Sequence, residues 1–173
     1  MAVGLVDIEG GRIRLDTAWQ TLVRPPAGTE FRAESVRVHG LTPERVAAAP
    51  EIGEVLPTLM GRLAGRIPIG HKALDFDAAF VTRALQQAYG IPFAGPLLDT
   101  ARLGEHLGSR VLHLRYGAVS TRLADLARQY GLCVYREHDA LADALTCAQL
   151  FLVMATRMEA LGSARASQIV GAR

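Results

Sequence analysis

The sequence predicts a single α/β domain over residues 1–161, followed by a disordered tail over 162–173. Short strand-like runs alternate along the chain with longer segments whose apolar residues recur at helical spacing, which is typical of α/β folds. A chain of 173 residues is long enough to bury a sizeable core. Half of the residues are hydrophobic and 21% are charged, as in ordinary globular proteins. The tail is small, polar and aperiodic.

The N-terminal part of the chain is predicted to start with a β-hairpin. Residues 3–8 and 13–23 have strand-like composition, and the glycines in the 9–12 segment between them suit a tight turn. A loop of small and polar residues follows. Thr42 and Pro43 are then a good N-cap and first helical residue, so a short helix should run to about Ala48.

The remaining elements alternate between helices and short strands. Helical spacing of apolar residues, with glycines at several ends, predicts the helices. The last helix is apolar nearly all round, which indicates a buried helix packed on a sheet. The predicted helices cover residues 51–63, 77–89, 100–107, 120–130 and 139–161, the predicted strands cover 67–71 and 96–100, and a loop is expected over 111–119.

Composition narrows the classes of function. The formal net charge of +2 is too small to indicate nucleic-acid binding by itself. The two cysteines, Cys133 and Cys147, form neither a disulfide framework nor a metal-binding pattern, and their apolar neighbours predict small core residues. We recognise no signal peptide and no apolar stretch long enough to span a bilayer. A cytoplasmic protein without a membrane contact is therefore expected.

Five short motifs follow one another along the chain, and each is weak alone. They are Thr21-Leu22-Val23-Arg24-Pro25, His39-Gly40-Leu41-Thr42, Gly70-His71 with Phe76-Asp77 and Phe80, Leu98-Asp99-Thr100-Ala101-Arg102-Leu103, and His138 with Asp143. Their order, from Val3 to about Met158, resembles the DnaQ-like 3′–5′ exonucleases, the DEDDh family that includes the epsilon subunit of DNA polymerase III.

The resemblance implies a ribonuclease-H-like mixed sheet flanked by helices. It also implies hydrolysis of phosphodiester bonds at the 3′ ends of single-stranded DNA or RNA, and a DNA polymerase subunit as a further partner. The family uses two divalent ions, Mg²⁺ or Mn²⁺, held by four carboxylates. By this resemblance Asp77 and Asp143 are metal ligands and His138 is the general base. Hard divalent ions prefer carboxylate oxygen, and a histidine that titrates near neutral pH suits proton transfer.

The same residues also have structural interpretations. Asp139 could cap the last helix, with Asp143 as a favourable first-turn acid and His138 as a loop residue. Asp77 could cap the helix that runs to Tyr89. These alternatives remain open from the sequence alone.

The motif around Asp77 departs from the family pattern. The interval from His71 to Asp77 is one residue longer than usual, and Lys72 replaces an asparagine, so Asp75 is a second candidate ligand. The flanking phenylalanines, Phe76 and Phe80, favour Asp77. Three further polar residues are expected to be mainly structural: Asp99 as a cap of the next helix, His71 at a strand end, and His39 in a turn that could lie near the site.

The family's other two carboxylates belong to a D-x-E-T-x-G motif on its central first strand. Asp7-Ile8-Glu9 has the D-x-E spacing, but Gly10-Gly11-Arg12 follows it and resembles the turn of the family's next hairpin. We therefore expect the chain to begin after that central strand, and to lack about 15–25 residues if strand and turn have ordinary lengths. An alternative function follows: a catalytically inactive module of the same fold that binds nucleic acid or a polymerase partner.

Overall fold

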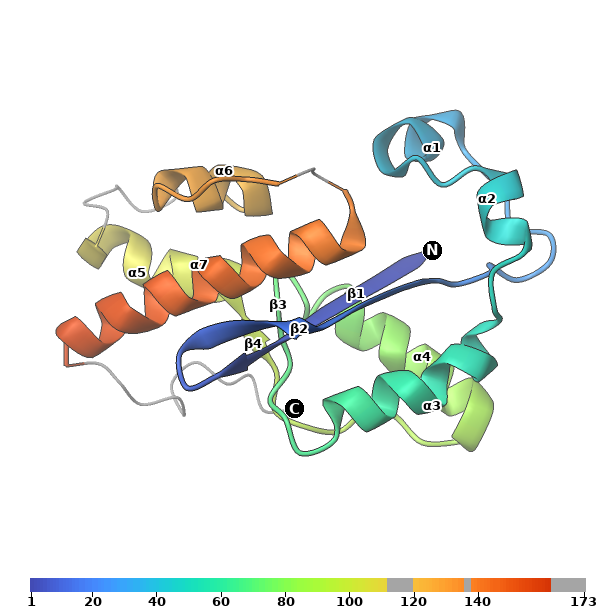
Figure 1. Cartoon of the computed structure of the whole chain (residues 1–173), viewed down its shortest axis with the longest axis horizontal. Helices are drawn as coiled ribbons and strands as arrows, with labels where there is room; N and C mark the ends of the chain where they lie inside the picture. The colour runs from blue at the N-terminus through green and yellow to red at the C-terminus, as the bar shows by residue number, and fades with distance from the viewer. Residues whose placement is uncertain (112–119, 136–137, 163–173) are drawn as a thin grey trace.

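In the computed structural model of the protein, the described residues are 1–111, 120–135 and 138–162 (Figure 1). Most of the loop predicted over 111–119, and residues 163–173 of the predicted tail, lie outside them. The elements are β1 Ala2–Glu9, β2 Arg12–Leu22, α1 Ala33–His39, α2 Pro43–Ala47, α3 Ile52–Leu63, β3 Ile69–Gly70, α4 Asp77–Tyr89, β4 Leu98–Asp99, α5 Thr100–Val111, α6 Leu123–Gln129 and α7 Ala140–Ala160.

The N-terminal hairpin forms as predicted. Strands β1 and β2 pair antiparallel, from Ala2 opposite Leu22 to Glu9 opposite Arg12. Both glycines of the turn have positive φ, 54° at Gly10 and 75° at Gly11, as a tight two-residue hairpin turn requires. The register shifts between Leu5 and Asp7. A bulge of this kind bends the ribbon toward its hairpin end.

The second strand pair is parallel and joins segments far apart in sequence. Ile69 of β3 lies opposite Leu98 of β4, and Gly70 lies opposite Asp99. Within the described residues, the two pairs form separate sheets that are not hydrogen-bonded to each other. The fold therefore contains the antiparallel and parallel pairings predicted for a mixed sheet. The missing central strand stays a prediction.

Helices cover both sides of the hairpin. In Figure 1, α5, α6 and α7 lie on one side of the β1–β2 ribbon, and α3 and α4 lie on the other. The side chains buried among α5, α6 and α7 include Leu107, Leu126, Leu150 and Met154. On the opposite side, Val3, Leu5 and Trp19 pack against a cluster centred on Leu56, Leu59, Ala84 and Leu85. This layered α/β arrangement confirms the predicted fold class.

Helix α7 packs directly on β1, and Gly4 makes this possible. A Cβ atom placed on Gly4 would collide with the backbone of Ala140 and Leu141 in the first turn of α7. By length and composition alone, α7 could cross a membrane, so the expectation of no such stretch was wrong. Its Leu150, Met154 and Met158 side chains are buried in the core instead.

Two further expectations need correction. The segment between Pro26 and His39 contains helix α1, where a loop was expected over its first part. This helix has seven residues, no side-chain cap and no buried residue, so it leaves no apolar period in the sequence. Cys133 is exposed rather than in the core, because it follows α6 on a surface segment, whereas Cys147 is buried as predicted.

Candidate functional site

Asp77 lies at the start of α4, beside the end of β3. A Cβ atom placed on Gly70 would lie 3.1 Å from Asp77 Oδ2, so the glycine leaves room for this carboxylate. The N-cap residue of α4 is Phe76, and no side chain makes a capping hydrogen bond there. The capping interpretation of Asp77 was therefore wrong. Within the described part of the chain, its carboxylate makes no hydrogen bond or ion pair, which leaves it available to a ligand.

The alternative candidate, Asp75, lies in a different place. It is exposed and lines an open hollow of about 290 Å³, together with Lys72, Arg102 and Glu105. Neither Asp77 nor Asp143 lines this hollow. The geometry therefore separates Asp75 from Asp77 and favours Asp77 as the candidate ligand of this motif.

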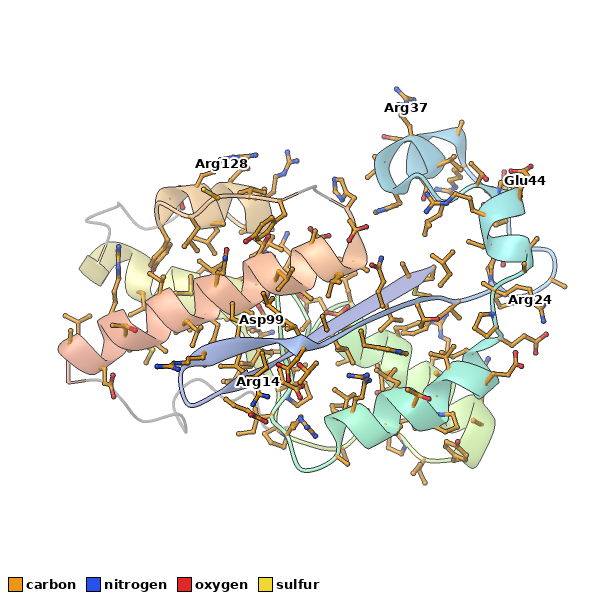
Figure 2. The ribbon with its side chains drawn as sticks, in the orientation of Figure 1. Arg14, Arg24, Arg37, Glu44, Asp99 and Arg128 are labelled. Atoms are coloured by element: carbon orange, nitrogen blue, oxygen red, sulfur yellow. The ribbon has the colours of Figure 1, made fainter. Side chains whose placement is uncertain are left out.

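Asp99 is buried, with 2% exposure, and both of its carboxylate oxygens accept hydrogen bonds from backbone N–H groups. Oδ1 accepts from Lys72 at 3.0 Å and from Ala101 at 2.9 Å, and Oδ2 accepts from Leu74 at 3.3 Å. Figure 2 shows Asp99 in the interior of the molecule, while Arg37 and Arg128 point outward. The expected structural role is confirmed, since Asp99 caps α5 and also holds the turn that leads to Asp77.

The negative charge of Asp99 affects the pKa of Asp77. Although Asp77 is exposed as a residue, the protein around its carboxyl group removes water and raises the pKa, and the nearby charge of Asp99 raises it further. A carboxylate that is poorly solvated and faces another negative charge is well suited to a cation.

The ring of His71 links the end of β3 by hydrogen bonds to two other segments of the chain. Its Nε2 lies 3.1 Å from the carbonyl oxygen of Thr121, and its Nδ1 lies 3.0 Å from the hydroxyl oxygen of Thr100. Because a carbonyl only accepts, Nε2 carries the proton and Nδ1 faces the hydroxyl as an acceptor. Burial lowers the pKa of His71, against the opposing effects of Thr121 and Asp99. The expected strand-end role of His71 is confirmed.

The entrance of α7 carries the last motif. Asp139 is the N-cap, and its Oδ1 accepts from the N–H of Ala142 at 3.1 Å. The cap is therefore Asp139, as the structural interpretation held, and Asp143 lies one turn inside the helix. His138 has a φ of 65°, in the left-handed region that side-chain-bearing residues rarely adopt. Its ring meets that of His39 edge to face, with 5.2 Å between ring centroids.

The charges of three carboxylates from different elements act on one buried thiol. Burial raises the pKa of Cys147 to about 12, against the opposing effect of a hydrogen bond with Thr100, and the negative charges of Asp77, Asp99 and Asp143 raise it further. Asp77 on α4 and Asp143 on α7 therefore both lie within electrostatic range of Cys147, as does Asp99 at the end of β4. This shared neighbour could not be read from sequence spacing.

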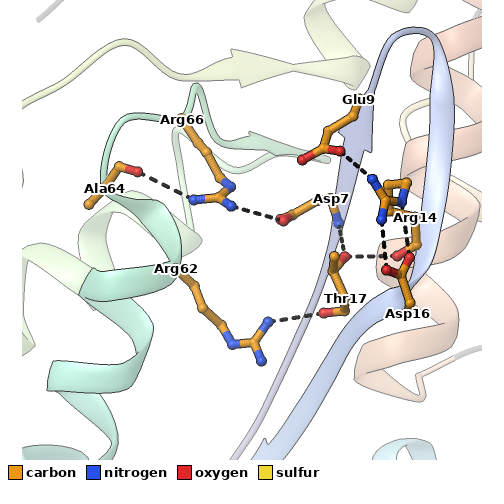
Figure 3. A network of polar contacts seen from close by, with 8 residues as sticks. All are labelled: Asp7, Glu9, Arg14, Asp16, Thr17, Arg62, Ala64 and Arg66. Atoms are coloured by element: carbon orange, nitrogen blue, oxygen red, sulfur yellow. Dashed lines mark hydrogen bonds and ion pairs between the residues drawn. The ribbon is translucent and has the colours of Figure 1, made fainter.

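Asp7 and Glu9 are engaged elsewhere (Figure 3). The Asp7 carboxylate pairs with Arg66 at 3.1 Å, and Glu9 pairs with Arg14 beside the hairpin turn. Gly4 is the β1 residue that touches the start of α7, and Glu9 lies five residues beyond it, about 17 Å along an ordinary strand. Both acids are thus bound by arginines and lie toward the hairpin end of β1.

The donors among the described residues are too few for a two-ion centre. Among the described residues, no group of three or more His, Cys, Asp or Glu side chains could hold a metal ion. Asp77 and Asp143 supply two carboxylates, whereas a pair of hard divalent ions needs more oxygen ligands than these. Both oxygens of Asp99 already accept hydrogen bonds from the backbone. The residues present fit half of such a centre.

The fold and these motifs define a DnaQ-like nuclease. The model of the RNase_T family, described as exonuclease, matches residues 1–151. The chain therefore belongs to the RNase_T exonuclease family.

Relatives in other organisms include DNA polymerases. The chain is 32% identical over 167 residues to the DNA polymerase III PolC-type of Thermotoga maritima, which covers 96% of this chain and 11% of that protein. It is 32% identical over 163 residues to a DNA polymerase III subunit epsilon-like protein of Rhodobacter capsulatus, covering 92% of this chain and 21% of that protein. The chain thus spans only a small part of the length of these relatives.

Solved structures share the fold. E. coli Exonuclease I in complex with a dT13 oligonucleotide superposes with a TM-score of 0.78 at 15% identity, over 93% of this chain and 38% of that one. Exonuclease X in complex with 5′ overhanging duplex DNA gives 0.68 at 22% identity, over 97% and 87%. The nuclease domain of 3′hExo, a DEDDh family member, gives 0.64 at 16% identity, over 94% of each chain. These neighbours support the ribonuclease-H-like fold.

Proposed function

We propose that this chain is the nuclease domain of a metal-dependent 3′–5′ exonuclease acting on the 3′ ends of single-stranded DNA or RNA. Asp77 and Asp143 are proposed as ligands of Mg²⁺ or Mn²⁺, and His138 as the general base. The observation that supports this best is that the charges of Asp77 and Asp143, carried by two helices far apart in the sequence, both act on the buried thiol of Cys147. His138 directly precedes the N-cap of the helix that carries Asp143.

The chemistry fits these residue types. Divalent ions bound by carboxylates can activate a water molecule and stabilise the leaving 3′ oxygen. A histidine within hydrogen-bond reach of that water takes its proton. The close approach of Asp77 to Gly70 and the position of Asp143 on a buried helix hold both carboxylates on rigid elements.

The proposal requires two more carboxylates than the described residues supply. A D-x-E-T-x-G strand between the β1–β2 and β3–β4 pairs would provide them, and Asp7 and Glu9 are already paired with arginines. The reading frame upstream of the first codon is the most economical check. An in-frame D-x-E-T-x-G within a few dozen codons supports the proposal, and an immediate in-frame stop codon contradicts it.

The direct test is degradation of 5′-labelled single-stranded DNA and RNA, in the presence of Mg²⁺ or Mn²⁺, by a protein that includes the D-x-E-T-x-G strand. We expect metal-dependent shortening from the 3′ end, abolished in Asp143→Ala and strongly reduced in His138→Ala. Asp75→Ala is the matched control, since this exposed acid lines a hollow that neither Asp77 nor Asp143 lines. Undiminished turnover in Asp143→Ala or His138→Ala would refute the site assignment.

A second candidate is a non-catalytic module of the same fold. It is favoured by the small donor set, because the described residues hold no group of three potential metal ligands. Under this proposal the purified chain binds single-stranded nucleic acid or a DNA polymerase subunit without metal-dependent turnover. The relatives named as DNA polymerase III proteins support a polymerase partner. Tight binding together with turnover would exclude this candidate.

A further inference from the structure

The backbone of His138 needs support from its surroundings. Its φ of 65° is unfavourable for a residue with a side chain, and such conformations persist where neighbouring contacts enforce them. The helix that follows is anchored through Asp139, whose side chain caps Ala142. That cap fixes the first turn of α7, but it does not involve the imidazole ring of His138, which is exposed.

The His39 ring provides the missing contact. The two rings are perpendicular, with an interplanar angle of 90° and 5.2 Å between centroids. Within residues 1–111, 120–135 and 138–162, neither ring makes a hydrogen bond. The edge-to-face contact with His39 is therefore the interaction that the structure shows for the His138 side chain. Edge-to-face packing places the positive edge of one ring against the negative face of the other, which favours one relative orientation.

His39 is itself held in place. It is the last residue of α1, and Gly40 ends that helix in the left-handed conformation, with its N–H bonded to the Val36 carbonyl at 2.8 Å. The Gly40 carbonyl accepts from Arg45 Nη1 at 2.7 Å. Thr42 in turn caps α2 by accepting from the N–H of Arg45 at 3.3 Å. The turn that carries His39 is therefore tied at both ends.

The location of α1 makes this contact informative. No residue of α1 is buried, so hydrophobic packing does not explain where its C-terminal end lies. Figure 1 shows α1 outside the layered core, on the side where α7 begins. The His39–His138 contact joins these two segments, which are 99 positions apart in the chain.

We propose that His39 is a positioning residue, which fixes the plane of the His138 imidazole and thereby the direction of its nitrogen lone pair. This inference rests on the proposed role of His138 as general base, because a base must point its lone pair at the proton it removes. His39 touches His138 and is assigned no contact with substrate. It acts through His138 alone.

The spectroscopic test uses nuclear Overhauser effects between histidine ring protons in the full chain. We expect ring-to-ring cross-peaks between His39 and His138. His39→Ala should shift and broaden the His138 ring signals, whereas His39→Phe should preserve the inter-ring cross-peaks because it keeps a flat ring. The control is His106→Ala, which removes an exposed histidine on α5. Unchanged His138 signals in His39→Ala would overturn the inference.

The kinetic test follows turnover of a 5′-labelled oligonucleotide. His39→Ala should lower kcat about tenfold with little change in KM, as expected for a misdirected catalytic group, and His39→Phe should recover most of the loss. Equal impairment of the two variants at an unchanged melting temperature would contradict positioning by the ring. Turnover is measured in a protein that includes the D-x-E-T-x-G strand; if that wild type shows none, the proposed function fails, and the spectroscopic experiment still decides whether His39 orients His138.

Discussion

Asp99 at the end of β4 accepts a hydrogen bond from the backbone N–H of Lys72, 27 positions earlier, at 3.0 Å. Lys72 has a φ of 56°, in the left-handed region. The same carboxylate accepts from Leu74, so it holds the whole turn between β3 and α4 in this unusual conformation. Asp77 directly follows that turn. The buried Asp99, which is not itself a candidate metal ligand, therefore determines where the candidate metal ligand Asp77 lies.

Asp99→Asn should therefore destabilise the protein. The asparagine keeps the size of the side chain but replaces one acceptor oxygen by a donor group, which faces the N–H of Leu74. We expect a loss of about 1–3 kcal/mol in the free energy of unfolding, measured by urea denaturation. The control is Asp75→Asn, an exposed position in the same turn, which should change it by less than about 0.5 kcal/mol. Equal effects at both positions would contradict the role of Asp99.

Gly4→Ala tests the packing of β1 on α7. The added methyl group would collide with the backbone of Ala140, and a backbone cannot move aside as a side-chain tip can. We expect a loss of about 1–3 kcal/mol in thermal or urea denaturation. Gly61→Ala in α3 is the matched substitution, since open space surrounds that position. It should stabilise the protein by about 0.5–1 kcal/mol, through helix propensity. A harmless Gly4→Ala would disprove the close approach.

Elements with a strong period were predictable from the sequence. The hairpin, α3 and α4 have alternating or helical apolar patterns, and α7 is a long apolar run; turn or cap residues such as Gly10, Gly90 and Asp139 lie at their ends. Asp77, His138 and Asp143 were predictable only through the order of the motifs. Each lies in a short pattern that the structural interpretations explain equally well.

The remaining features depend on contacts across the fold. Helix α1 buries no residue, so no sequence pattern marks it. The charges of three carboxylates, on α4, β4 and α7, act on Cys147, and the contact of His39 with His138 joins two turns. The position of His39 in an H-G-x-T motif was the one sequence signal for its location near the site. Its ring partner follows only from the tertiary structure.

Asp7→Asn and Glu9→Gln test whether the D-x-E spacing on β1 has a role in metal binding. Each acid already pairs with an arginine, so neither substitution should change the Mn²⁺-induced broadening of protein NMR signals. Asp77→Asn and Asp143→Asn should each reduce that broadening. The loss of the partly exposed Asp7–Arg66 ion pair should lower the free energy of unfolding by less than about 1 kcal/mol. Reduced broadening in Asp7→Asn would return Asp7 to the set of candidate ligands.

His71 should make stability depend on pH. Burial lowers its pKa in the folded state below the ordinary value of about 6.5, so the unfolded chain binds more protons in mild acid. The contribution of neutral His71 is therefore fully present above about pH 6.5 and is lost as the pH falls through and below that value. Its two hydrogen bonds, to Thr100 and Thr121, are made by the neutral ring.

The measurement is urea denaturation of wild type and His71→Gln between pH 8 and pH 5. At pH 8 the variant should be less stable, by about 1–2 kcal/mol, because it loses the two hydrogen bonds of the imidazole ring. The difference should shrink toward pH 5, since wild type alone is penalised for keeping a histidine neutral. His106→Gln removes an exposed histidine and should show a difference that does not vary with pH. If the difference in free energy of unfolding between wild type and His71→Gln stayed constant from pH 8 to pH 5, His71 would keep an ordinary pKa in the folded protein.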